Sequence, residues 1–314
     1  MRIGTRGSKL ARWQADHVAA RLRAAGREVE IVVIRTQGDR VLDVPLSAIG
    51  DPGLFTKELD EALLDGRIDV AVHSLKDLPT VLPEGLRIAA VSARAEPWDA
   101  FVAHPAYDGT LADLPPGAVI ATSSLRRQAQ LRAWRPDLRT VSVRGNVPTR
   151  LAALADSGVP GDGGWHGVIL AAAGLQRLGF DDQIRERIAP QIMVPAVGQG
   201  ALGVVCTEEN ASASALLSRL LDDDATRTVA LAERAFMRRL DGGCQVPIGG
   251  YARLETGSTF TIEGVVASID GRQVFRGEQT GTPSQAVTLA QALADELLAR
   301  GAREVLNAIR ADVA

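Results

Sequence analysis

The chain has 314 residues, 46% of them hydrophobic and 23% charged, which is enough to bury the cores of two or three domains. Its formal net charge of −3 argues against a nucleic-acid partner, because such proteins concentrate positive charge. No run of about 18 apolar residues is free of charge, and residues 1–6 contain no apolar signal core. We therefore expect a cytoplasmic protein that does not enter a membrane.

The N-terminal part alternates strand-like and helix-like patterns. Apolar runs predict strands at 2–5, 30–35 and 68–73, and helical spacing of apolar residues predicts helices at 10–25 and 56–64. Because strands and helices alternate, we expect a parallel sheet, whose ligands bind at the carboxyl ends of the strands.

The middle of the chain repeats this pattern. Strands are predicted at 118–121, 140–143 and 167–171, and each of the first two leads into a polar segment. The stretch 155–164 is rich in glycine and contains a proline, so it is predicted to be an exposed loop without a chemical role.

A glycine-rich run at 198–203 matches the G-x-G-x-x-G pattern of dinucleotide-binding proteins. Its context is wrong, because Pro195 interrupts the preceding run and a strand-like run follows where a helix should begin. We expect these glycines to permit tight chain crossing between domains.

The last third changes character after a predicted helix at 226–240, which Gly242 and Gly243 are expected to end. Strand-like runs at 259–267 and 273–278 flank a hairpin-turn signal, Asp270-Gly271. A helical pattern resumes near residue 284, with a probable break at Gly301. This part is predicted to be a small α+β domain.

The first polar cluster follows the predicted strand 68–73 and contains Ser74, Lys76 and Asp77. A lysine, an aspartate and a hydroxyl at one strand end can bind anions and stabilise developing cations. The alternative is an ordinary solvated loop closed by Pro79.

The second polar cluster combines the hydroxyls of Thr122, Ser123 and Ser124 with the guanidinium groups of Arg126 and Arg127. Helix N-termini and arginine forks both bind carboxylate or phosphate. The alternative is a capped surface helix with arginines in its first turn.

Further polar residues follow two other predicted strands: Arg144, Asn146 and Arg150 in the middle of the chain, and Arg6 and Ser8 near its start. In parallel sheets these strand ends converge on one crevice. The predicted ligand is a small molecule with several carboxylates or phosphates.

The two cysteines have different surroundings. Cys206 ends an apolar run and is predicted to be a buried small hydrophobic residue. Cys244 lies in a loop opened by glycines directly after a predicted helix, where a thiol is accessible. The spacing alone leaves open whether Cys244 is a nucleophile, an attachment point or a tolerated loop cysteine.

Six motifs in order along the chain together resemble the hydroxymethylbilane synthase (porphobilinogen deaminase) family. They are Ile3-Gly4-Thr5-Arg6-Gly7-Ser8, Ala71-Val72-His73-Ser74-Leu75-Lys76-Asp77, Thr122-Ser123-Ser124-Leu125-Arg126-Arg127, Arg144-Gly145-Asn146, Ala196-Val197-Gly198-Gln199-Gly200 and Gly242-Gly243-Cys244-Gln245-Val246-Pro247-Ile248-Gly249.

The resemblance implies an α/β fold with two lobes like those of periplasmic binding proteins and a small α+β C-terminal domain. It implies a first lobe from 1–93 and 194–214, a second lobe from 98–190, and a C-terminal domain at 216–314 that carries the cofactor cysteine. We expect a monomer.

The resemblance also implies the chemistry. A dipyrromethane cofactor is linked through sulfur at Cys244, and four porphobilinogen units condense head to tail with loss of ammonia before hydrolysis releases hydroxymethylbilane. Loss of ammonia produces a cationic azafulvene, and Asp77 fits the role of the catalytic carboxylate that stabilises the positive charge. Each pyrrole carries two carboxylates, which explains the need for many arginines.

The resemblance assigns site residues in two groups, and it implies no metal. The cofactor-binding group is Phe55, Ser74, Lys76, Asp77, Thr122, Ser123, Ser124, Arg126, Arg127, Arg144 and Cys244. The substrate-binding group is Arg6, Ser8, Arg144, Asn146, Arg150, Arg177 and Gln199.

One segment departs from the family pattern, because Ala48 and Pro52 stand where the family usually has lysines. This departure puts the anion-binding role of the loop in doubt. Two rival functions are a non-catalytic two-lobed module that binds small anions and, more distantly, a one-lobe phosphate-binding transferase. The absence of an export signal and the presence of Cys244 argue against the binding module.

Overall fold

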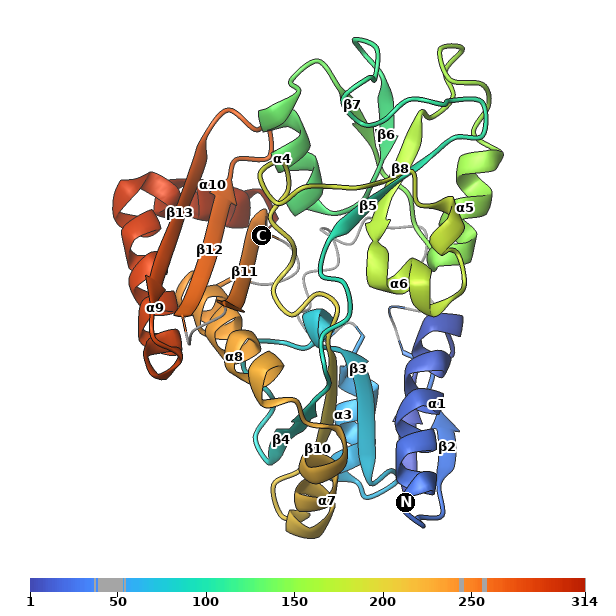
Figure 1. Ribbon diagram of the computed structural model, residues 1–314, viewed down its shortest axis with the longest axis vertical. Helices are drawn as coiled ribbons and strands as arrows, with labels where there is room; N and C mark the ends of the chain where they lie inside the picture. The colour runs from blue at the N-terminus through green and yellow to red at the C-terminus, as the bar shows by residue number, and fades with distance from the viewer. Residues whose placement is uncertain (37, 39–52, 54, 243–245, 256–258, 314) are drawn as a thin grey trace.

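The computed structural model describes residues 1–36, 38, 53, 55–242, 246–255 and 259–313 (Figure 1). Three predicted site positions, Ala48, Pro52 and Cys244, lie outside the described residues.

The first sheet contains strands from both ends of the first 210 residues. Its strands are β1 (Arg2–Thr5), β2 (Glu30–Val33), β3 (Val70–Ser74), β4 (Leu86–Val91) and β10 (Leu202–Thr207). They lie in the order β2-β1-β3-β10-β4, with β1 parallel to β2 and β3, and β10 antiparallel to both of its neighbours. The helices around this sheet are α1 (Lys9–Ala24), α3 (Lys57–Leu64) and α7 (Ala211–Leu221).

The second sheet repeats this arrangement. Its strands are β5 (Asp99–Ala103), β6 (Val119–Ala121), β7 (Arg139–Val141), β8 (Gly167–Ala171) and β9 (Glu186–Arg187). The order is β7-β6-β8-β5-β9, again with one strand, β5, antiparallel to both neighbours. Its helices are α4 (Leu125–Trp134), α5 (Val147–Ala155) and α6 (Ala172–Arg177).

The predicted strands of each unit pair in parallel as expected, β1 with β2 and β3, and β6 with β7 and β8. Antiparallel strands complete both sheets, so both are mixed. The chain crosses between the sheets twice, through residues 92–98 and 188–201, which we call the inter-lobe segments. The first strand after each crossing, β5 or β10, is the antiparallel one. Strands β5 and β10 therefore start at the end of the sheet that faces the other lobe. The strands that follow a helix run in the opposite direction.

The glycine-rich run lies in the second inter-lobe segment. Gly200 has φ of +94°, and a Cβ at this position would lie 2.5 Å from the carbonyl oxygen of Ala95 in the other segment. Only glycine fits this conformation and this close approach. The expectation that these glycines permit tight chain crossing is confirmed.

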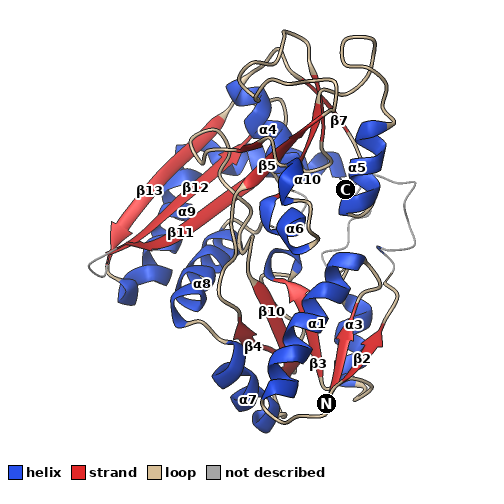
Figure 2. Cartoon of the chain, turned by 45° about the vertical axis from the view of Figure 1, so that its right-hand side comes forward, coloured by secondary structure: helices blue, strands red, loops and turns tan. Residues whose placement is uncertain are grey.

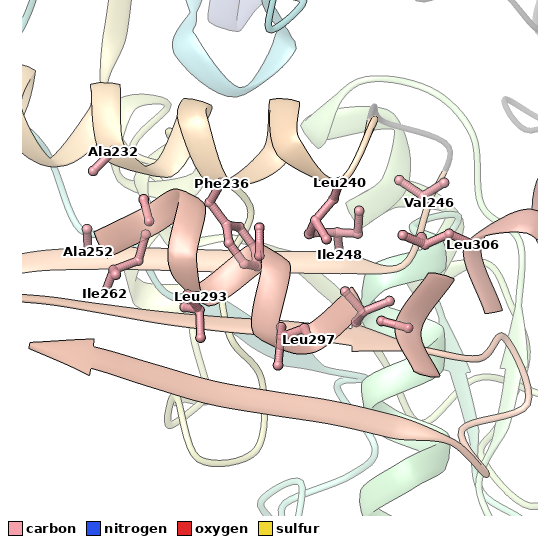
Figure 3. Close-up of a cluster of buried hydrophobic side chains, with 14 of the residues drawn as sticks. Ala232, Phe236, Leu240, Val246, Ile248, Ala252, Ile262, Leu293, Leu297 and Leu306 are labelled. Atoms are coloured by element: carbon pink, nitrogen blue, oxygen red, sulfur yellow. The ribbon is translucent and has the colours of Figure 1, made fainter. Parts of the chain in front are cut away.

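The C-terminal sheet is antiparallel, in the order β11 (Ile248–Glu255), β12 (Thr259–Ala267) and β13 (Val274–Gly281). Helices α8 (Asp224–Arg239), α9 (Ala286–Leu297) and α10 (Arg303–Val313) complete this part. Figure 3 shows its core, where Phe236 of α8, Ile248 and Ile262 of the sheet, and Leu293 of α9 pack together. The helices and strands of this part thus share one hydrophobic core.

The end of α8 differs from the prediction. The residue with left-handed backbone is Asp241, with φ of +48°, while Gly242 is not left-handed. A Cβ on Gly242 would crowd the side-chain ends of Met237 and Ile248, so glycine here leaves room for packing and is not required by its dihedral angles.

The three sheets give the predicted fold class of two α/β units and a small C-terminal α+β unit. In Figures 1 and 2 the two α/β units lie one above the other, and the C-terminal sheet lies beside the crossing segments. Among the described residues, no helix is both long and apolar enough to span a membrane.

Candidate functional site

The turn from β1 into α1 brings polar groups to the end of the first sheet. Ser8 is the N-cap of α1, and its Oγ accepts a hydrogen bond of 3.2 Å from the Ala11 amide. The Cζ atom of Arg6 lies 4.1 Å from the centre of the Phe55 ring, a cation–π contact. Phe55, which comes much later in the sequence, therefore lies beside the turn that carries Arg6 and Ser8.

Strand β3 ends in the 3-10 helix Leu75–Asp77, which carries the predicted catalytic carboxylate. Next to it is a cavity of about 50 Å³. The cavity is lined by Arg6, Ser8, Leu10, Ala11, Gln14, Phe55, Val72, His73, Ser74 and Asp77. The structure thus brings Asp77 together with four other predicted site residues at one strand end.

Two polar residues of this cavity were not among the predicted site residues. Gln14 is buried, and its Nε2 donates a 2.8 Å hydrogen bond to Ser74 Oγ. His73 is 5% exposed, and its Nε2 has no hydrogen-bond partner among the described residues. Burial, with a smaller effect of Arg6, lowers the pKa of His73 to about 3, so the imidazole is neutral at physiological pH.

In the second lobe, the two arginines at the start of α4 point inward to Asp99. Arg126 Nη1 donates to Asp99 Oδ2 at 2.7 Å, and Arg127 Nε donates to Asp99 Oδ1 at 2.9 Å. Asp99 is fully buried. Burial alone would raise the pKa of Asp99, but the two arginines lower it well below its usual range.

Main-chain carbonyls accept a further hydrogen bond from each of these arginines. Arg126 Nη1 also donates to Val194 O at 2.8 Å, and Arg127 Nη1 donates to Ile169 O at 2.7 Å. Both side chains are therefore built into the protein interior, and a direct contact with a cofactor stays a prediction.

Gln199 connects this buried cluster to the first lobe. Its Nε2 donates to Asp99 Oδ1 at 3.1 Å, and its Oε1 accepts a 3.2 Å hydrogen bond from Lys76 Nζ. Burial lowers the pKa of Lys76 to about 8, with Asp77 and Asp99 opposing the shift and Arg126 and Arg127 adding to it. The polar groups of the two lobes thus meet at Gln199.

Arg150 lies within electrostatic reach of both lobes. Burial lowers its pKa to about 10, nearby Arg127 and Arg144 add to this effect, and Asp77 of the first lobe opposes it. Its Nε donates a 2.8 Å hydrogen bond to Gly145 O. The structure therefore brings Arg150 within electrostatic reach of Asp77 and of Arg144, and a role of Arg144 beside Asp77 stays a prediction.

The polar residues beside these arginines have structural partners. Asn146 is the N-cap of α5, and its Oδ1 accepts from the Thr149 amide at 3.0 Å. Ser123 Oγ donates to Val143 O at 2.6 Å, and Thr122 Oγ1 accepts from the Ser124 amide at 3.3 Å. These bonds hold the loops in place, and ligand contacts of these residues stay predictions.

Arg177 ends α6 and lies where the two lobes approach each other. Its Nη2 donates a 2.6 Å hydrogen bond to Gly200 O, and its Cζ lies 5.5 Å from the ring centre of Trp13 on α1. Burial lowers the pKa of Arg177 to about 10. Trp13 is a further residue of this region that the motifs did not indicate.

Asp99 is the main functional residue that the sequence analysis missed. It opens the apolar strand β5, where a single acidic residue gives no motif. The sequence shows only a carboxylate at the start of an apolar run and, elsewhere in the chain, two consecutive arginines. These signals do not indicate that Asp99 pairs with Arg126 and Arg127.

A larger cavity of about 580 Å³ lies elsewhere in the second lobe, between β5, α5 and residues 182–185. None of the predicted site residues lines it. Within the described ranges, no three His, Cys, Asp or Glu side chains are grouped as metal ligands.

Solved structures with a similar arrangement share little sequence with the chain. A periplasmic substrate-binding protein of an ABC transporter from Coxiella burnetii has a TM-score of 0.42 at 15% identity, covering 73% of this chain and 94% of that protein. The VFT2 domain of BvgS from Bordetella pertussis has a TM-score of 0.39 at 12% identity, covering 75% and 90%. Similarity this distant indicates nothing about what the chain binds.

The sequence comparisons are much closer. Residues 1–215 match the family "Porphobilinogen deaminase, dipyromethane cofactor binding domain", and residues 227–299 match "Porphobilinogen deaminase, C-terminal domain". A relative from Syntrophomonas wolfei, named porphobilinogen deaminase, is 46% identical over 308 residues, which are 98% of this chain and 97% of the relative. The family predicted from the motifs is confirmed: the chain belongs to the porphobilinogen deaminases, the transferases of tetrapyrrole biosynthesis that have a dipyrromethane cofactor.

Proposed function

We propose that this enzyme condenses porphobilinogen where Asp77 of the first lobe faces the cations of the second lobe. One observation carries the proposal: Asp77 lines the cavity at the end of β3 and interacts electrostatically with Lys76 and Arg150. A carboxylate among several cations suits a substrate that has both carboxylates and pyrrole N–H groups.

Asp77 is proposed as the catalytic residue. Its carboxylate accepts a hydrogen bond from a pyrrole N–H and stabilises the positive charge that develops when porphobilinogen loses ammonia. The low polarity of a partly closed site strengthens this interaction. The 3-10 helix fixes the position of Asp77, since the Leu75 amide donates to Ala201 O at 3.0 Å.

The acetate and propionate groups of the pyrroles are proposed to bind the cations and hydroxyls around Asp77. Charge-assisted hydrogen bonds from guanidinium groups are the strongest available contacts for carboxylates. The proposed binding residues are Arg6, Ser8, Ser74, Lys76, Thr122, Ser123, Ser124, Arg126, Arg127, Arg144, Asn146, Arg150, Arg177 and Gln199. For Arg126 and Arg127 the ion pairs with Asp99 favour an indirect contribution.

The residues around the cavity fit part of a dipyrromethane. A space of about 50 Å³ accepts a carboxylate side group and is too small for two pyrrole rings. The buried Nε2 of His73 and the hydroxyl of Ser74 are suitable polar groups for such a carboxylate. When bound, the cofactor supplies the pyrrole end to which substrate units are added, and Phe55 is proposed to pack beside it.

Cys244 is proposed to carry this cofactor through its sulfur. It lies outside the described residues, and the support is its position in the family motif and in the loop directly after α8. Cys206 is no competitor, because it is fully buried in the core of the first lobe and burial raises the pKa of its thiol.

We further propose a division into lobes at the inter-lobe segments, with 1–93 in the first lobe and 98–190 in the second. The expected boundary between 214 and 216 lies inside α7, and α7 packs in the core formed with α1 and β4. We therefore extend the second part of the first lobe to 194–221 and begin the C-terminal domain at 222. A monomeric state and a cytoplasmic location stay predictions.

The attachment site is tested by intact-mass spectrometry of the purified protein. The wild-type chain should carry the added mass of a dipyrromethane, and Cys244→Ser should lack it and be inactive. The matched control, Cys206→Ser, should retain the added mass. Active Cys244→Ser, or an active wild-type chain without added mass, would contradict the proposal.

A further inference from the structure

The segment directly after the proposed catalytic residue is bound by the C-terminal domain. Arg234 of α8 reaches the main chain of residues 78–80: its Nη2 donates to Pro79 O at 2.6 Å and to Thr80 O at 3.2 Å, and its Nη1 donates to Leu78 O at 3.4 Å. One side chain thus contacts three successive carbonyls that begin one residue after Asp77.

Arg234 is buried without an acidic partner. It is 7% exposed, and no carboxylate among the described residues forms an ion pair with it. Burial, with an added effect of Arg238, lowers its pKa to about 10, so the guanidinium is still charged at physiological pH. A buried charge is costly unless polar groups compensate it, and here carbonyl dipoles do so.

The 3-10 helix of Asp77 is therefore held at both ends. Before it, the Leu75 amide donates to Ala201 O at 3.0 Å, in the second inter-lobe segment. After it, Arg234 binds the carbonyls at 78–80, including that of the C-cap residue Leu78. The first contact comes from the main chain of the lobes, and the second comes from another domain.

Helix α8 also contacts the crossing point of the lobes. The residue next to Arg234 is Glu233, which is fully buried. Its Oε1 forms an ion pair of 2.6 Å with Arg94, and its Oε2 accepts a 2.7 Å hydrogen bond from the Gly198 amide. Figure 1 shows α8 between the C-terminal sheet and the first sheet. In the sequence, the same helix ends at Arg239, shortly before Cys244, which lies outside the described residues.

We infer that Arg234 is a positioning residue for Asp77: it fixes the 3-10 helix Leu75–Asp77 relative to α8. The inference rests on the catalytic role proposed for Asp77. A small displacement of a catalytic group lowers turnover strongly, because its interaction with the reacting atoms depends on distance and direction.

The test compares Arg234→Gln with Arg239→Gln, the same change on the same helix. Arg239 is a suitable control because its side chain is 55% exposed and pairs with Asp295 on α9. In Arg234→Gln we expect kcat to fall about tenfold, with KM changed less than about twofold and full cofactor loading by intact mass. Arg239→Gln should keep wild-type values.

Arg234→Lys provides a second test in case Arg234→Gln does not fold. Lysine keeps the charge and a donor but not the planar fork that reaches separate carbonyls. Its kcat should lie between those of wild type and Arg234→Gln. Wild-type kcat in folded, fully loaded Arg234→Lys and Arg234→Gln would overturn the inference, as would loss of cofactor loading with normal kcat per loaded molecule.

A double-mutant cycle separates this inference from the role of Asp77 itself. If Arg234 acts through Asp77, the effect of Arg234→Gln on kcat should shrink to less than about twofold in an Asp77→Asn background. Independent, multiplying effects would overturn the positioning role while leaving the role of Asp77 intact. Near-wild-type turnover of Asp77→Asn alone would instead overturn the proposed catalytic role.

Discussion

The two lobes have the same strand order but use equivalent positions in opposite ways. In each lobe the strand that is parallel to both of its neighbours, β1 or β6, leads into a helix through a polar turn. In the first lobe this turn carries Arg6, which lines the cavity beside Asp77. In the second lobe it carries Arg126 and Arg127, which are buried on Asp99.

The two lobes thus use positively charged side chains in two different ways. The buried arginines of the second lobe stabilise an ionic cluster that holds α4, β5 and Gln199 together. Cations near the cavity have room to bind a ligand. A strand end in a known fold therefore indicates where polar groups gather, and we expect a buried counter-charge, such as Asp99 for Arg126 and Arg127, to keep an arginine from binding ligand directly.

The largest expected effect comes from breaking the buried cluster. Arg126→Leu leaves Asp99 with one arginine fewer and should lower the free energy of unfolding by about 3–5 kcal/mol, with incomplete cofactor loading as a consequence. Arg6→Leu removes a contact with Phe55 and should cost about 1 kcal/mol or less. Denaturant unfolding and intact mass measure both effects.

The comparison between the lobes would fail if Arg126→Leu were as stable as wild type and Arg6→Leu were not. Arg135→Leu is a useful additional control, because its partner Asp137 lies near the surface of the same lobe and exposed pairs contribute little.

The next largest effect concerns the acid of the first lobe. Asp77→Asn keeps the shape and a hydrogen-bond acceptor but removes the charge, so kcat should fall about 10²-fold or more with little change in stability. Asp65→Asn, at an exposed pair with Arg67, is the matched control and should keep its turnover. Turnover of Asp77→Asn close to wild type would remove this residue from the mechanism.

A pH profile distinguishes Lys76 from the arginines. Its pKa of about 8 means that it is charged below pH 8 and loses its charge above it. Bound carboxylates favour the charged form, so its contribution to binding is complete below pH 8 and falls as pH rises, by up to about tenfold in KM per pH unit. In Lys76→Arg this alkaline rise in KM should disappear, and its persistence would assign the rise to another group.

The sequence predicted the fold class because periodic apolar runs and ordered motifs are local signals. It did not name β4, β5, β9 and β11 as strands. In β11 two adjacent glycines disfavour a strand, yet a Cβ on Gly249 would lie 2.7 Å from Val194 O, so close packing with the inter-lobe segment requires glycine. This requirement comes from residues far away in the sequence.

The site was predictable to the same degree. Motif residues at strand ends gave the correct neighbourhood, and the cavity residues Arg6, Ser8, Phe55, Ser74 and Asp77 lie together. The direction of Arg126 and Arg127 was not predictable, because it depends on Asp99, whose pairing arises only when β5 lies beside β8 and α4 covers them. Arg234 was missed for a similar reason, since its partners are main-chain carbonyls of another domain.

The smallest expected effect concerns Ala48 and Pro52, which lie outside the described residues and stand where the family usually has lysines. Adding Lys at either position increases the positive charge of the first lobe, which has fewer cations near Asp77 than the second. Exposed charges attract a ligand carboxylate by about 1 kcal/mol or less, because water and salt screen them. Ala48→Lys and Pro52→Lys should therefore change kcat/KM by less than about tenfold, the equivalent of 1.4 kcal/mol.

Proline also reduces the conformational freedom of the unfolded chain, so Pro52→Lys should show the smaller gain of the two. A gain of about a hundredfold in either variant would mean that too little positive charge near Asp77 limits substrate binding, and the cations already present in the first lobe would not suffice for the proposed site.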